Sequence, residues 1–239
     1  MEATRIALVT GGNKGIGLEI ARQLARAGIV VIIGARDAGR ARSAVEALAA
    51  DGLAVHALHL DLDDPATAKA AAAEIDVRHG RLDILVNNAG IFDFADATPG
   101  RASLDAVRRV MNTNFIGTLA VTQAMLPLVR AAPAGRIVNL SSSLGSLALN
   151  GDPNSTYYGA QFIGYNASKA ALNMLTVQLN EELRGSGIRV NSVSPGFVLT
   201  DLTGQGSMTA EEGAMLPVRY ALGGEDSGCF IEPNGVTPW

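Results

Sequence analysis

The chain has 239 residues, a formal net charge of −4, a sequence pI near 5.4 and 48% hydrophobic residues. This length allows one large core. The mild acidity argues against a nucleic-acid partner, because a protein that binds nucleic acid usually carries a stripe of basic residues. The single cysteine, Cys229, cannot form an internal disulfide, so a reducing compartment fits. The N-terminal stretch lacks the pattern of a secretory signal, and no apolar run is long enough to span a membrane. These features predict a cytoplasmic protein with no membrane partner.

Short apolar runs alternate with longer amphipathic segments along the chain. The runs predict strands at 5–10, 29–35, 53–60, 82–88, 135–142, 187–194 and 228–232. The segments between them predict helices at about 15–27, 38–50, 65–79, 102–130, 156–184 and 209–222. This alternation predicts an α/β, single-domain Rossmann fold over residues 1–239, with a doubly wound parallel sheet of about seven strands and helices on both faces. The loops at about 143–156 and 197–208 follow strands, so we expect them to surround the substrate.

A glycine-rich stretch, "TGGNKGIG" at 10–17, follows the first predicted strand and opens the first predicted helix. Gly11 would permit the tight turn, while Gly15 and Gly17 would let the backbone approach a pyrophosphate and let the helix pack on the strand. Amide groups at a helix start bind anionic phosphate. An ordinary strand-to-helix connection is the alternative, but the place of the turn after an N-terminal strand favours a dinucleotide site.

The end of the second predicted strand, "VVIIGARD", bears on which dinucleotide binds. An acid there usually holds the ribose 2′-hydroxyl of the non-phosphorylated cofactor, whereas an arginine favours a 2′-phosphate. Ala35 occupies the expected acid position, Arg36 follows it and Lys14 supplies a second cation, so the sequence predicts NADP(H). Asp37 is the competing ribose acid, and we interpret it as the cap of the next helix. Asp61, after the third strand, is either a partner for the adenine amino group or a turn residue.

The segment "GYNASKAALNML" at 164–175 holds Tyr165, one of four tyrosines, and Lys169, one of three lysines. Positions four apart on a helix are neighbours. A free phenol has a pKa near about 10, and a cation about 4–6 Å away lowers it toward the value that an acid/base tyrosine needs. The alternative is a tyrosine at a helix edge beside a solvated lysine, without a catalytic role. For the pair alone, this alternative is the better interpretation.

Polar residues elsewhere favour the catalytic interpretation. "IVNLSSS" ends the fifth predicted strand in serines, which can donate to a carbonyl oxygen where negative charge develops. "LVNNAG" at 85–90 ends the fourth strand in amides and a glycine, suited to a loop under a cofactor. Asn114 lies inside a predicted helix, where asparagine is a poor helix former unless its side chain has a function or a buried partner.

Five blocks, "TGGNKGIG", "NNAG", "NLSSS", "YNASK" and "SPGFVLTD", occur in this order. Together they resemble the short-chain dehydrogenase/reductase family over essentially the whole chain. The resemblance implies that Tyr165 is the general acid/base, and that Lys169 holds the nicotinamide ribose hydroxyls and lowers the tyrosine pKa. It also implies that Ser142 polarises the carbonyl, with Ser141 and Ser143 as alternatives.

The resemblance further implies that Asn114 kinks its helix and anchors a water that relays protons to the lysine. Cofactor contacts are expected in two groups. In the first 62 residues they are Gly11, Asn13, Lys14, Gly15, Ile16, Gly17, Arg36, Asp61 and Leu62. Further along they are Asn88, Ala89, Gly90, Tyr165, Lys169, Pro195, Gly196, Val198 and Thr200. Pro195, Gly196, Val198 and Thr200 would cover the nicotinamide, with Thr200 near its carboxamide, and hydride would pass to or from the substrate carbon in a dry cleft.

Within the family, the resemblance is closest to NADPH-dependent carbonyl reductases, on the strength of "GGNKGIG", "ARD", "TNFIGT" and the stretch from "TAEEGAMLPVRYAL" to "GVTPW". It implies reversible hydride transfer to a small, largely apolar ketone or aldehyde. The alternatives are an NAD-dependent alcohol dehydrogenase and a catalytically idle NADP-binding regulatory module. Ser142 and Tyr165 are 23 positions apart, more than in common tetrameric members and far fewer than in monomeric carbonyl reductases. The extra residues are expected to fold over the substrate mouth or to alter a subunit contact in a homodimer or homotetramer.

The expected lining of the substrate pocket is apolar, and ordinary packing explains any one of its members equally well. These residues are Phe92, Phe94, Leu144, Leu147, Phe197, Leu199, Met208 and Met215. The 197–208 loop holds no lysine or arginine, which argues against a highly anionic substrate. Cys229 is expected to be a small buried hydrophobe, and the sequence predicts no metal site.

Overall fold

The computed structural model describes residues 4–239, and its centre is a sheet in the order β3-β2-β1-β4-β5-β6-β7-β8. The strands are β1 (Ile6–Thr10), β2 (Val30–Ala35), β3 (Val55–His59), β4 (Ile84–Asn87), β5 (Arg136–Leu140), β6 (Arg189–Val193), β7 (Phe230–Glu232) and β8 (Gly235–Val236). All pairs from β3 to β7 are parallel, which confirms the predicted doubly wound sheet. Residues 1–3, part of the stretch that lacks a secretory-signal pattern, lie outside the described residues.

The eighth strand is a difference from the expected number. β8 pairs antiparallel with β7, placing Ile231 opposite Val236, and the chain turns between them at Pro233 and Asn234. A strand of two residues is too short to show a period in the sequence. The sheet is therefore mostly parallel, with a short antiparallel edge at its C-terminal side.

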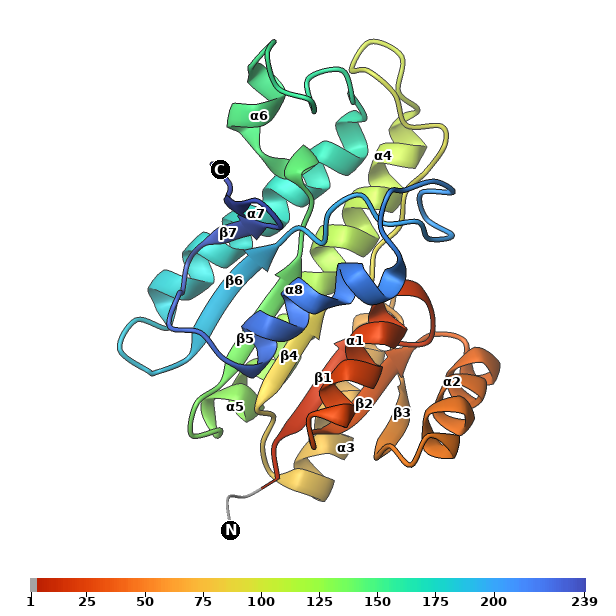
Figure 1. Cartoon of the computed structure of the whole chain (residues 1–239), viewed down its shortest axis with the longest axis vertical. Coiled ribbons are helices and arrows are strands. Elements are labelled where there is room, and N and C mark those ends of the chain that lie inside the picture. Colours follow the sequence, from red (N-terminus) through yellow and green to blue (C-terminus); the bar gives the residue numbers. More distant parts are fainter. Residues whose placement is uncertain (1–3) are drawn as a thin grey trace.

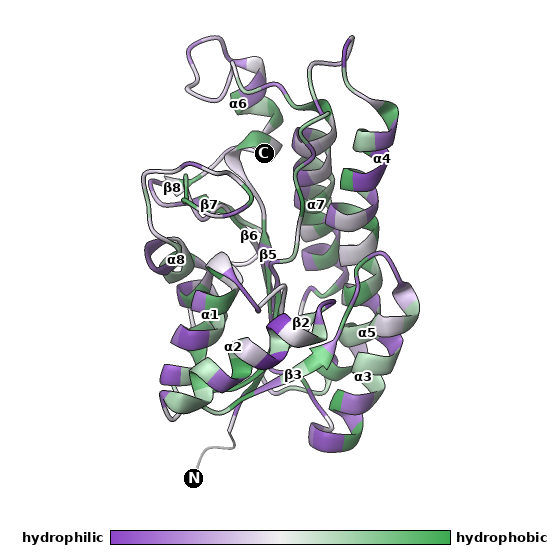
Figure 2. Ribbon diagram, turned by 90° about the vertical axis from the view of Figure 1, so that its right-hand side faces the viewer, coloured by the Kyte–Doolittle hydropathy of each residue, from purple (hydrophilic) through white to green (hydrophobic). Residues whose placement is uncertain are grey.

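Helices cover both faces of the sheet (Figures 1 and 2). On one face lie α1 (Gly15–Arg26), α2 (Ala38–Ala50) and α8 (Ala210–Leu222). On the other lie α3 (Pro65–His79), α4 (Leu104–Met111), α5 (Thr118–Arg130) and α7 (Ile163–Glu182). Each face has its own apolar cluster, one under α1 and α8 and one under α3 and α5. The central strands are buried on both sides, which explains why they read as continuous apolar runs.

Two predicted helices have different bounds in the structure. The helix predicted at 102–130 is α4, then a π-helical turn at Asn112–Gly117, then α5. The helix predicted at 156–184 begins only at Ile163. Before it, the side chains of Asp152 and Ser155 each accept a hydrogen bond from the backbone amide two residues on, which stabilises turns at the expense of helix. A short helix, α6 (Leu147–Gly151), lies within the expected 143–156 loop.

The carboxyl ends of β1, β4, β5 and β6 meet at one edge of the sheet, because these strands are parallel neighbours. The order reverses at β1, which pairs with β2 on one side and β4 on the other. Ligands of open α/β sheets bind at such a reversal point, outside the carboxyl ends. No helix within residues 4–239 combines the length and the apolar character that crossing a membrane requires.

Candidate active site

The predicted catalytic residues lie at the carboxyl end of β5 and on α7. Tyr165 and Lys169 project from consecutive turns of α7, and the Lys169 Nζ lies 5.7 Å from the centre of the Tyr165 ring. The Ser142 side chain, just past β5, lies close enough to the Tyr165 phenol to lower its pKa. Lys169 is 5% exposed, and its Nζ donates to the Leu140 carbonyl oxygen at 2.7 Å. The fold therefore brings the three groups together at the sheet edge.

The three serines that follow β5 have different surroundings. Ser141 Oγ donates to Asn173 Oδ1 at 2.6 Å, and Ser143 Oγ donates to Glu232 Oε2 at 2.6 Å. Both of these serines are buried. Ser142 is only partly buried, and its hydroxyl reaches the tyrosine. The geometry therefore favours Ser142 over its two alternatives as the serine that can meet a substrate oxygen.

The pKa of the Tyr165 phenol is raised, not lowered. Burial raises it to about 12, and the Ser142 side chain opposes this rise only in part. The Lys169 ammonium is directed to the Leu140 carbonyl oxygen and is itself buried. The net shift is therefore opposite to the predicted lowering, because burial outweighs any effect of Lys169 on the tyrosine pKa. At neutral pH the phenol is protonated, which is the form that can donate a proton to a carbonyl oxygen.

Burial lowers the pKa of Lys169 to about 8, because a buried ammonium loses its hydration. The hydrogen bond to the Leu140 carbonyl offsets part of this cost. The loop after β4 passes close by: a Cβ at Gly90 would lie 3.7 Å from the Lys169 Nζ and 3.2 Å from Asn114 Oδ1. A glycine at position 90 thus lets the backbone of this loop approach the ammonium.

Asn114 lies within the π-helical turn, so the helix is irregular at this residue, as predicted. Its Oδ1 accepts from the Ile91 amide at 2.7 Å, and its Nδ2 donates to the Ile91 carbonyl at 2.9 Å and to Ser168 Oγ at 3.1 Å. π-Helical turns frequently occur at functional sites. Asn114 ties the loop after β4 to α7, while its predicted part in a water relay stays a prediction.

The glycine-rich turn joins the ends of β1 and β4. Gly11 and Gly15 have φ values of 63° and 54°, a region that favours glycine. A Cβ at Gly17 would come 2.4 Å from both the Asn88 Nδ2 and the Gly11 carbonyl oxygen, so a larger residue does not fit. Asn88 Nδ2 also donates to the Thr10 carbonyl at 2.8 Å. The turn is therefore held in shape by direct contact with the loop after β4.

The start of α1 is open to an anion. Lys14 stands at its N-cap, and in the described chain α1 has neither a side-chain cap nor an acid in its first turn. By contrast, Asp64 caps α3 and Ser103 caps α4 with their own oxygens. Lys14 Nζ pairs with Asp201 Oδ2 at 3.0 Å, and both side chains are exposed. Uncapped amides beside a cation are the donor set that a phosphate group needs.

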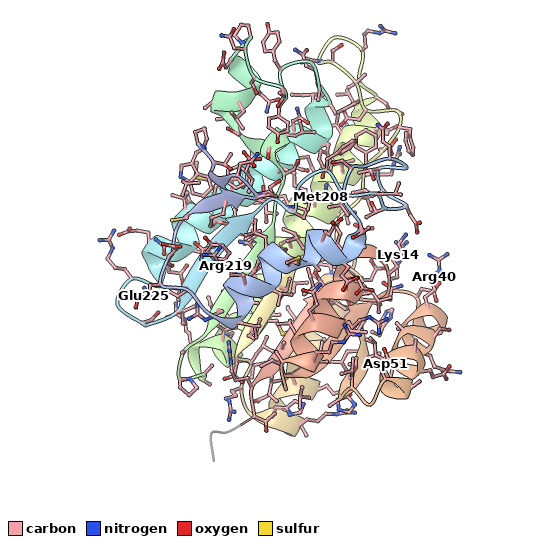
Figure 3. The ribbon with its side chains drawn as sticks, in the orientation of Figure 1. Lys14, Arg40, Asp51, Met208, Arg219 and Glu225 are labelled. Carbon is pink, nitrogen blue, oxygen red and sulfur yellow. The ribbon has the colours of Figure 1, made fainter. Side chains whose placement is uncertain are left out.

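The end of β2 adds further positive charge. Arg36 is largely exposed, with its guanidinium 4.0 Å from Asp63 Oδ2. Asp37 Oδ1 accepts from the Arg40 amide at 2.9 Å and caps α2, which confirms its interpretation as a cap. Lys14 and Arg40, labelled in Figure 3 at the starts of α1 and α2, both lie near enough to Asp201 to lower the pKa of its carboxyl. Lys14, Arg36 and Arg40 thus supply positive charge at the starts of α1 and α2, where a 2′-phosphate is expected.

Several other predicted cofactor residues have packing contacts of their own. Asp61 Oδ1 accepts from the amide two residues on at 3.1 Å, the contact of an ordinary turn, so its bond to adenine stays a prediction. Leu62 is 8% exposed and packs on Gly117 of the π-helical turn, where a Cβ would come 2.7 Å from the Leu62 Cβ. The remaining members of this group are half-buried: Asn13, Ile16 and Ala89.

The loop after β6 folds back over the glycine-rich turn. Gly196 has a φ of 90°, and Pro195 before it is half-buried. The Thr200 methyl group lies 3.8 Å from the position of a Cβ at Gly15. Val198 is 2% exposed, and its side chain packs against α8. Because this packing occupies the Val198 side chain, its backbone is the part open to a cofactor, and the predicted contact stays a prediction.

The C-terminal residues hold the segment between Ser142 and Tyr165, which the sequence did not reveal. Glu232 Oε2 accepts from Ser143 Oγ at 2.6 Å and from Tyr157 OH at 3.1 Å. The Trp239 carbonyl accepts from the Ala148 amide at 3.1 Å, and the C-terminus lies beside α6 (Figure 1). Partners this far apart along the chain leave no local pattern that could have predicted the contact.

Among the apolar residues expected at the substrate mouth, Phe92 contacts the tyrosine directly. Its ring meets the Tyr165 ring edge to face, with centroids 5.6 Å apart. Five others are strongly exposed: Phe94, Leu147, Phe197, Leu199 and Met215. The loop after β4, α6, the 197–208 loop and α8 thus all carry exposed apolar side chains, as an apolar ligand requires.

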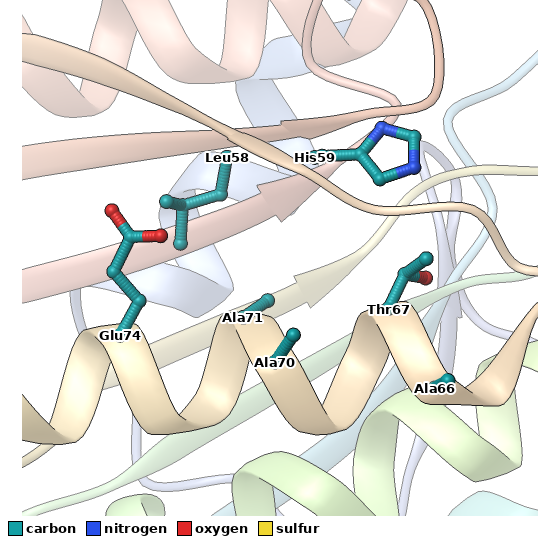
Figure 4. Close-up of a pocket in the computed structure, with 7 residues that line it drawn as sticks. All are labelled: Leu58, His59, Ala66, Thr67, Ala70, Ala71 and Glu74. Atoms are coloured by element: carbon teal, nitrogen blue, oxygen red, sulfur yellow. The ribbon is translucent and has the colours of Figure 1, made fainter.

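A groove of about 320 Å³ lies at the outer strand of the parallel sheet, between β3 and α3 (Figure 4). It is lined by Leu58, His59, Ala66, Thr67, Ala70, Ala71 and Glu74. His59 and Glu74 lie at its opposite ends. The groove includes no predicted catalytic residue. Over residues 4–239, no group of three or more His, Cys, Asp or Glu side chains is placed to hold a metal ion.

The fold and the site define an α/β oxidoreductase: a mostly parallel sheet has a glycine-rich turn after its first strand and a serine, a tyrosine and a lysine at the same edge. The sequence pattern described as "short chain dehydrogenase" matches residues 5–211. The chain therefore belongs to the short-chain dehydrogenase/reductase family. This confirms the family that the five sequence blocks indicated.

Relatives and solved structures agree with this assignment. The chain is 36% identical to "Carbonyl reductase [NADPH] 1" of Mus musculus over 281 aligned positions, which cover 98% of each chain. The structure matches NADPH-bound carbonyl reductase from chicken fatty liver with a TM-score of 0.85 at 33% identity, over 99% of both chains. It also matches salutaridine reductase from Papaver somniferum, with a TM-score of 0.82 at 31% identity over 95% of this chain and 99% of that one.

Proposed function

We propose that the protein is an NADPH-dependent carbonyl reductase that converts a small, largely apolar ketone or aldehyde to the alcohol. The observation that carries this proposal is the meeting of Ser142, Tyr165 and Lys169 at the sheet edge beside an uncapped helix start. A proton donor and an anion-binding turn at one edge are what hydride transfer to a carbonyl requires.

The residues present fit a dinucleotide. The backbone at Gly11 and Gly15 and the first amides of α1 would hold the pyrophosphate, since no local acid competes for these amides in the described structure. Lys169 and the loop at Gly90 would hold the nicotinamide end. When bound, the cofactor supplies the hydride that adds to the carbonyl carbon.

The preference for NADPH over NADH rests on the corner at the end of β2. Ala35 offers no carboxylate to the ribose, and Asp37 is engaged in capping α2. Arg36 and Lys14 are exposed cations that can pair with a 2′-phosphate. The similar carbonyl reductases are named for NADPH or hold it, which supports the same choice.

Proton transfer in this proposal belongs to Tyr165. Its protonated phenol donates to the carbonyl oxygen as negative charge develops there, while Ser142 donates a second hydrogen bond to the same oxygen. The buried ammonium of Lys169 favours the phenolate that this donation leaves behind. In the reverse direction the phenolate would accept the proton of a secondary alcohol.

The substrate class follows from the lining. Phe92 packs on the tyrosine ring, and the 197–208 loop holds no lysine or arginine. An apolar carbonyl compound matches these surroundings better than an anionic one. A cytoplasmic location and a homodimer or homotetramer stay predictions.

The test is a panel of ketones, aldehydes and alcohols assayed by nicotinamide absorbance with NADPH, NADP⁺, NADH and NAD⁺. We expect ketone or aldehyde reduction with NADPH to have the highest kcat/KM. A higher kcat/KM for alcohols with NAD⁺ would favour the dehydrogenase alternative. Cofactor binding without turnover across the panel would favour the idle module.

A further inference from the structure

The start of α7, the helix that carries Tyr165, is capped by a residue distant in the sequence. Asp96, in the loop after β4, accepts from the Gly164 amide through Oδ1 at 3.0 Å and from the Tyr165 amide through Oδ2 at 2.8 Å. Its Oδ1 also accepts from the Ala97 amide at 2.9 Å. Asp96 is 5% exposed. One buried carboxylate thus binds the backbone of the proposed proton donor itself.

The local sequence offers this helix no cap. Phe162 stands at the N-cap position, and its hydrocarbon side chain cannot accept a hydrogen bond. The first amides of a helix need acceptors, and a buried carboxylate needs donors, so each satisfies the other here. The Ile163 amide, directly before these two, donates to the Ala97 carbonyl at 3.0 Å. The whole first turn of α7 is therefore fastened to the loop after β4.

Asp96 is closely packed between the start of α7 and α4. A Cβ at Gly164 would lie 3.1 Å from Asp96 Oδ2 and 3.1 Å from the Val107 Cα, so the glycine allows the carboxylate and α4 to approach. On the same loop, Phe92 meets the Phe162 ring edge to face at 5.0 Å between centroids, in addition to its contact with the tyrosine. Loop and helix start form one packed unit.

We infer that Asp96 is a positioning residue for the proton transfer: it fixes the backbone of Tyr165 and so the place of the phenol. The inference rests on the proposed function, because it needs Tyr165 to be the proton donor. Lys169 lies one turn further and has its own anchor at the Leu140 carbonyl, so loss of the Asp96 contact should disturb the tyrosine and spare the lysine. A displacement of about 1 Å in a reacting group can cost about 100-fold in rate.

The test compares Asp96→Asn, which keeps the shape but loses one acceptor, with Asp96→Ala, which loses both. We expect kcat for ketone reduction to fall about 10- to 100-fold in Asp96→Ala and less in Asp96→Asn, with the NADPH Kd changed by less than about two-fold. Amide hydrogen exchange at Gly164 and Tyr165, measured by NMR, should speed up in the same order. Asp64→Asn, which makes the same exchange at the cap of α3, is the matched control and should leave kcat unchanged.

The exchange measurement does not depend on activity, so the proposed function and the role of Asp96 can be tested separately. Wild-type protein without NADPH-dependent reductase activity would remove the proposed function and the role of Asp96 with it. An active wild type whose Asp96 variants are folded and keep kcat and slow exchange would overturn the inference alone. Failure of both variants to fold would also overturn it, because Asp96 would then support the fold as a whole. A parallel loss of kcat and NADPH affinity would do the same.

Discussion

Two helix starts at the same edge of the sheet meet opposite partners. At α1 the first amides face a turn with positive-φ glycines, and Lys14 stands at the N-cap. At α7 two of the first amides donate hydrogen bonds to the buried carboxylate of Asp96. Every helix presents such unpaired amides, so the difference lies only in what the fold places before them. A helix start whose amides have no partner can bind an anion from solution. A helix start whose amides are bound by a carboxylate holds the side chains of its own helix in place.

Among changes at the two helix starts, the largest effect is expected from Gly17→Ala at α1. The added Cβ would come 2.4 Å from the Gly11 carbonyl oxygen, which is backbone and cannot rotate away. We expect a loss of about 1–3 kcal/mol in the free energy of unfolding and a rise of the NADPH Kd by more than about ten-fold. Urea unfolding and nicotinamide fluorescence titration measure the two effects. Gly100→Ala, where a Cβ meets no atom within 4 Å, should change neither.

A smaller effect, limited to one cofactor, is expected from Arg36→Asp. Removing a cation that pairs with the 2′-phosphate should lower kcat/KM with NADPH about 10- to 100-fold, in line with about 1.5–3 kcal/mol for a charged hydrogen bond. The value with NADH should change far less. Arg26→Asp, at the opposite end of α1, makes the same charge change as a control. An equal loss with both cofactors would contradict the assignment of Arg36.

A third effect, seen only in the pH dependence of stability, concerns the α7 side. Burial lowers the pKa of Lys169 from 10.5 to about 8, so between these values the unfolded chain binds more protons than the folded protein. Stability should therefore rise with pH across this window, by about 3 kcal/mol relative to Lys169→Met. Urea unfolding of both proteins at several pH values measures this difference. A constant difference would show that the ammonium is not buried in solution.

The sequence predicted the sheet and most helices because buried parallel strands and amphipathic helices leave regular patterns. It missed β8, which is too short to show a period, and it began α7 too early. Residues 156–162 follow the turns made by Asp152 and Ser155, and a pattern of apolar residues does not report such side-chain-to-backbone bonds. A cap close in sequence was predictable, as Asp37 at the start of α2 shows.

The site was predictable in its members and less so in its electrostatics. The positions of Ser142, Tyr165 and Lys169 follow from motif spacing, and the structure brings them together. The direction of the tyrosine pKa does not follow, because it depends on burial and on which oxygen the lysine meets. Asp96 stood in no motif, since the amides it binds are 68 and 69 positions further along the chain.

The central claim is that the Tyr165 phenol supplies the proton to the substrate oxygen, and Tyr165→Phe tests it most directly. General acid catalysis by a positioned group is worth about 100- to 10,000-fold, so kcat for ketone reduction should fall by that factor. The NADPH Kd, measured by fluorescence on the same samples, should stay unchanged, and Tyr158→Phe, at a partly exposed tyrosine, should have wild-type activity. A folded Tyr165→Phe protein that binds NADPH and keeps the wild-type kcat would contradict the account.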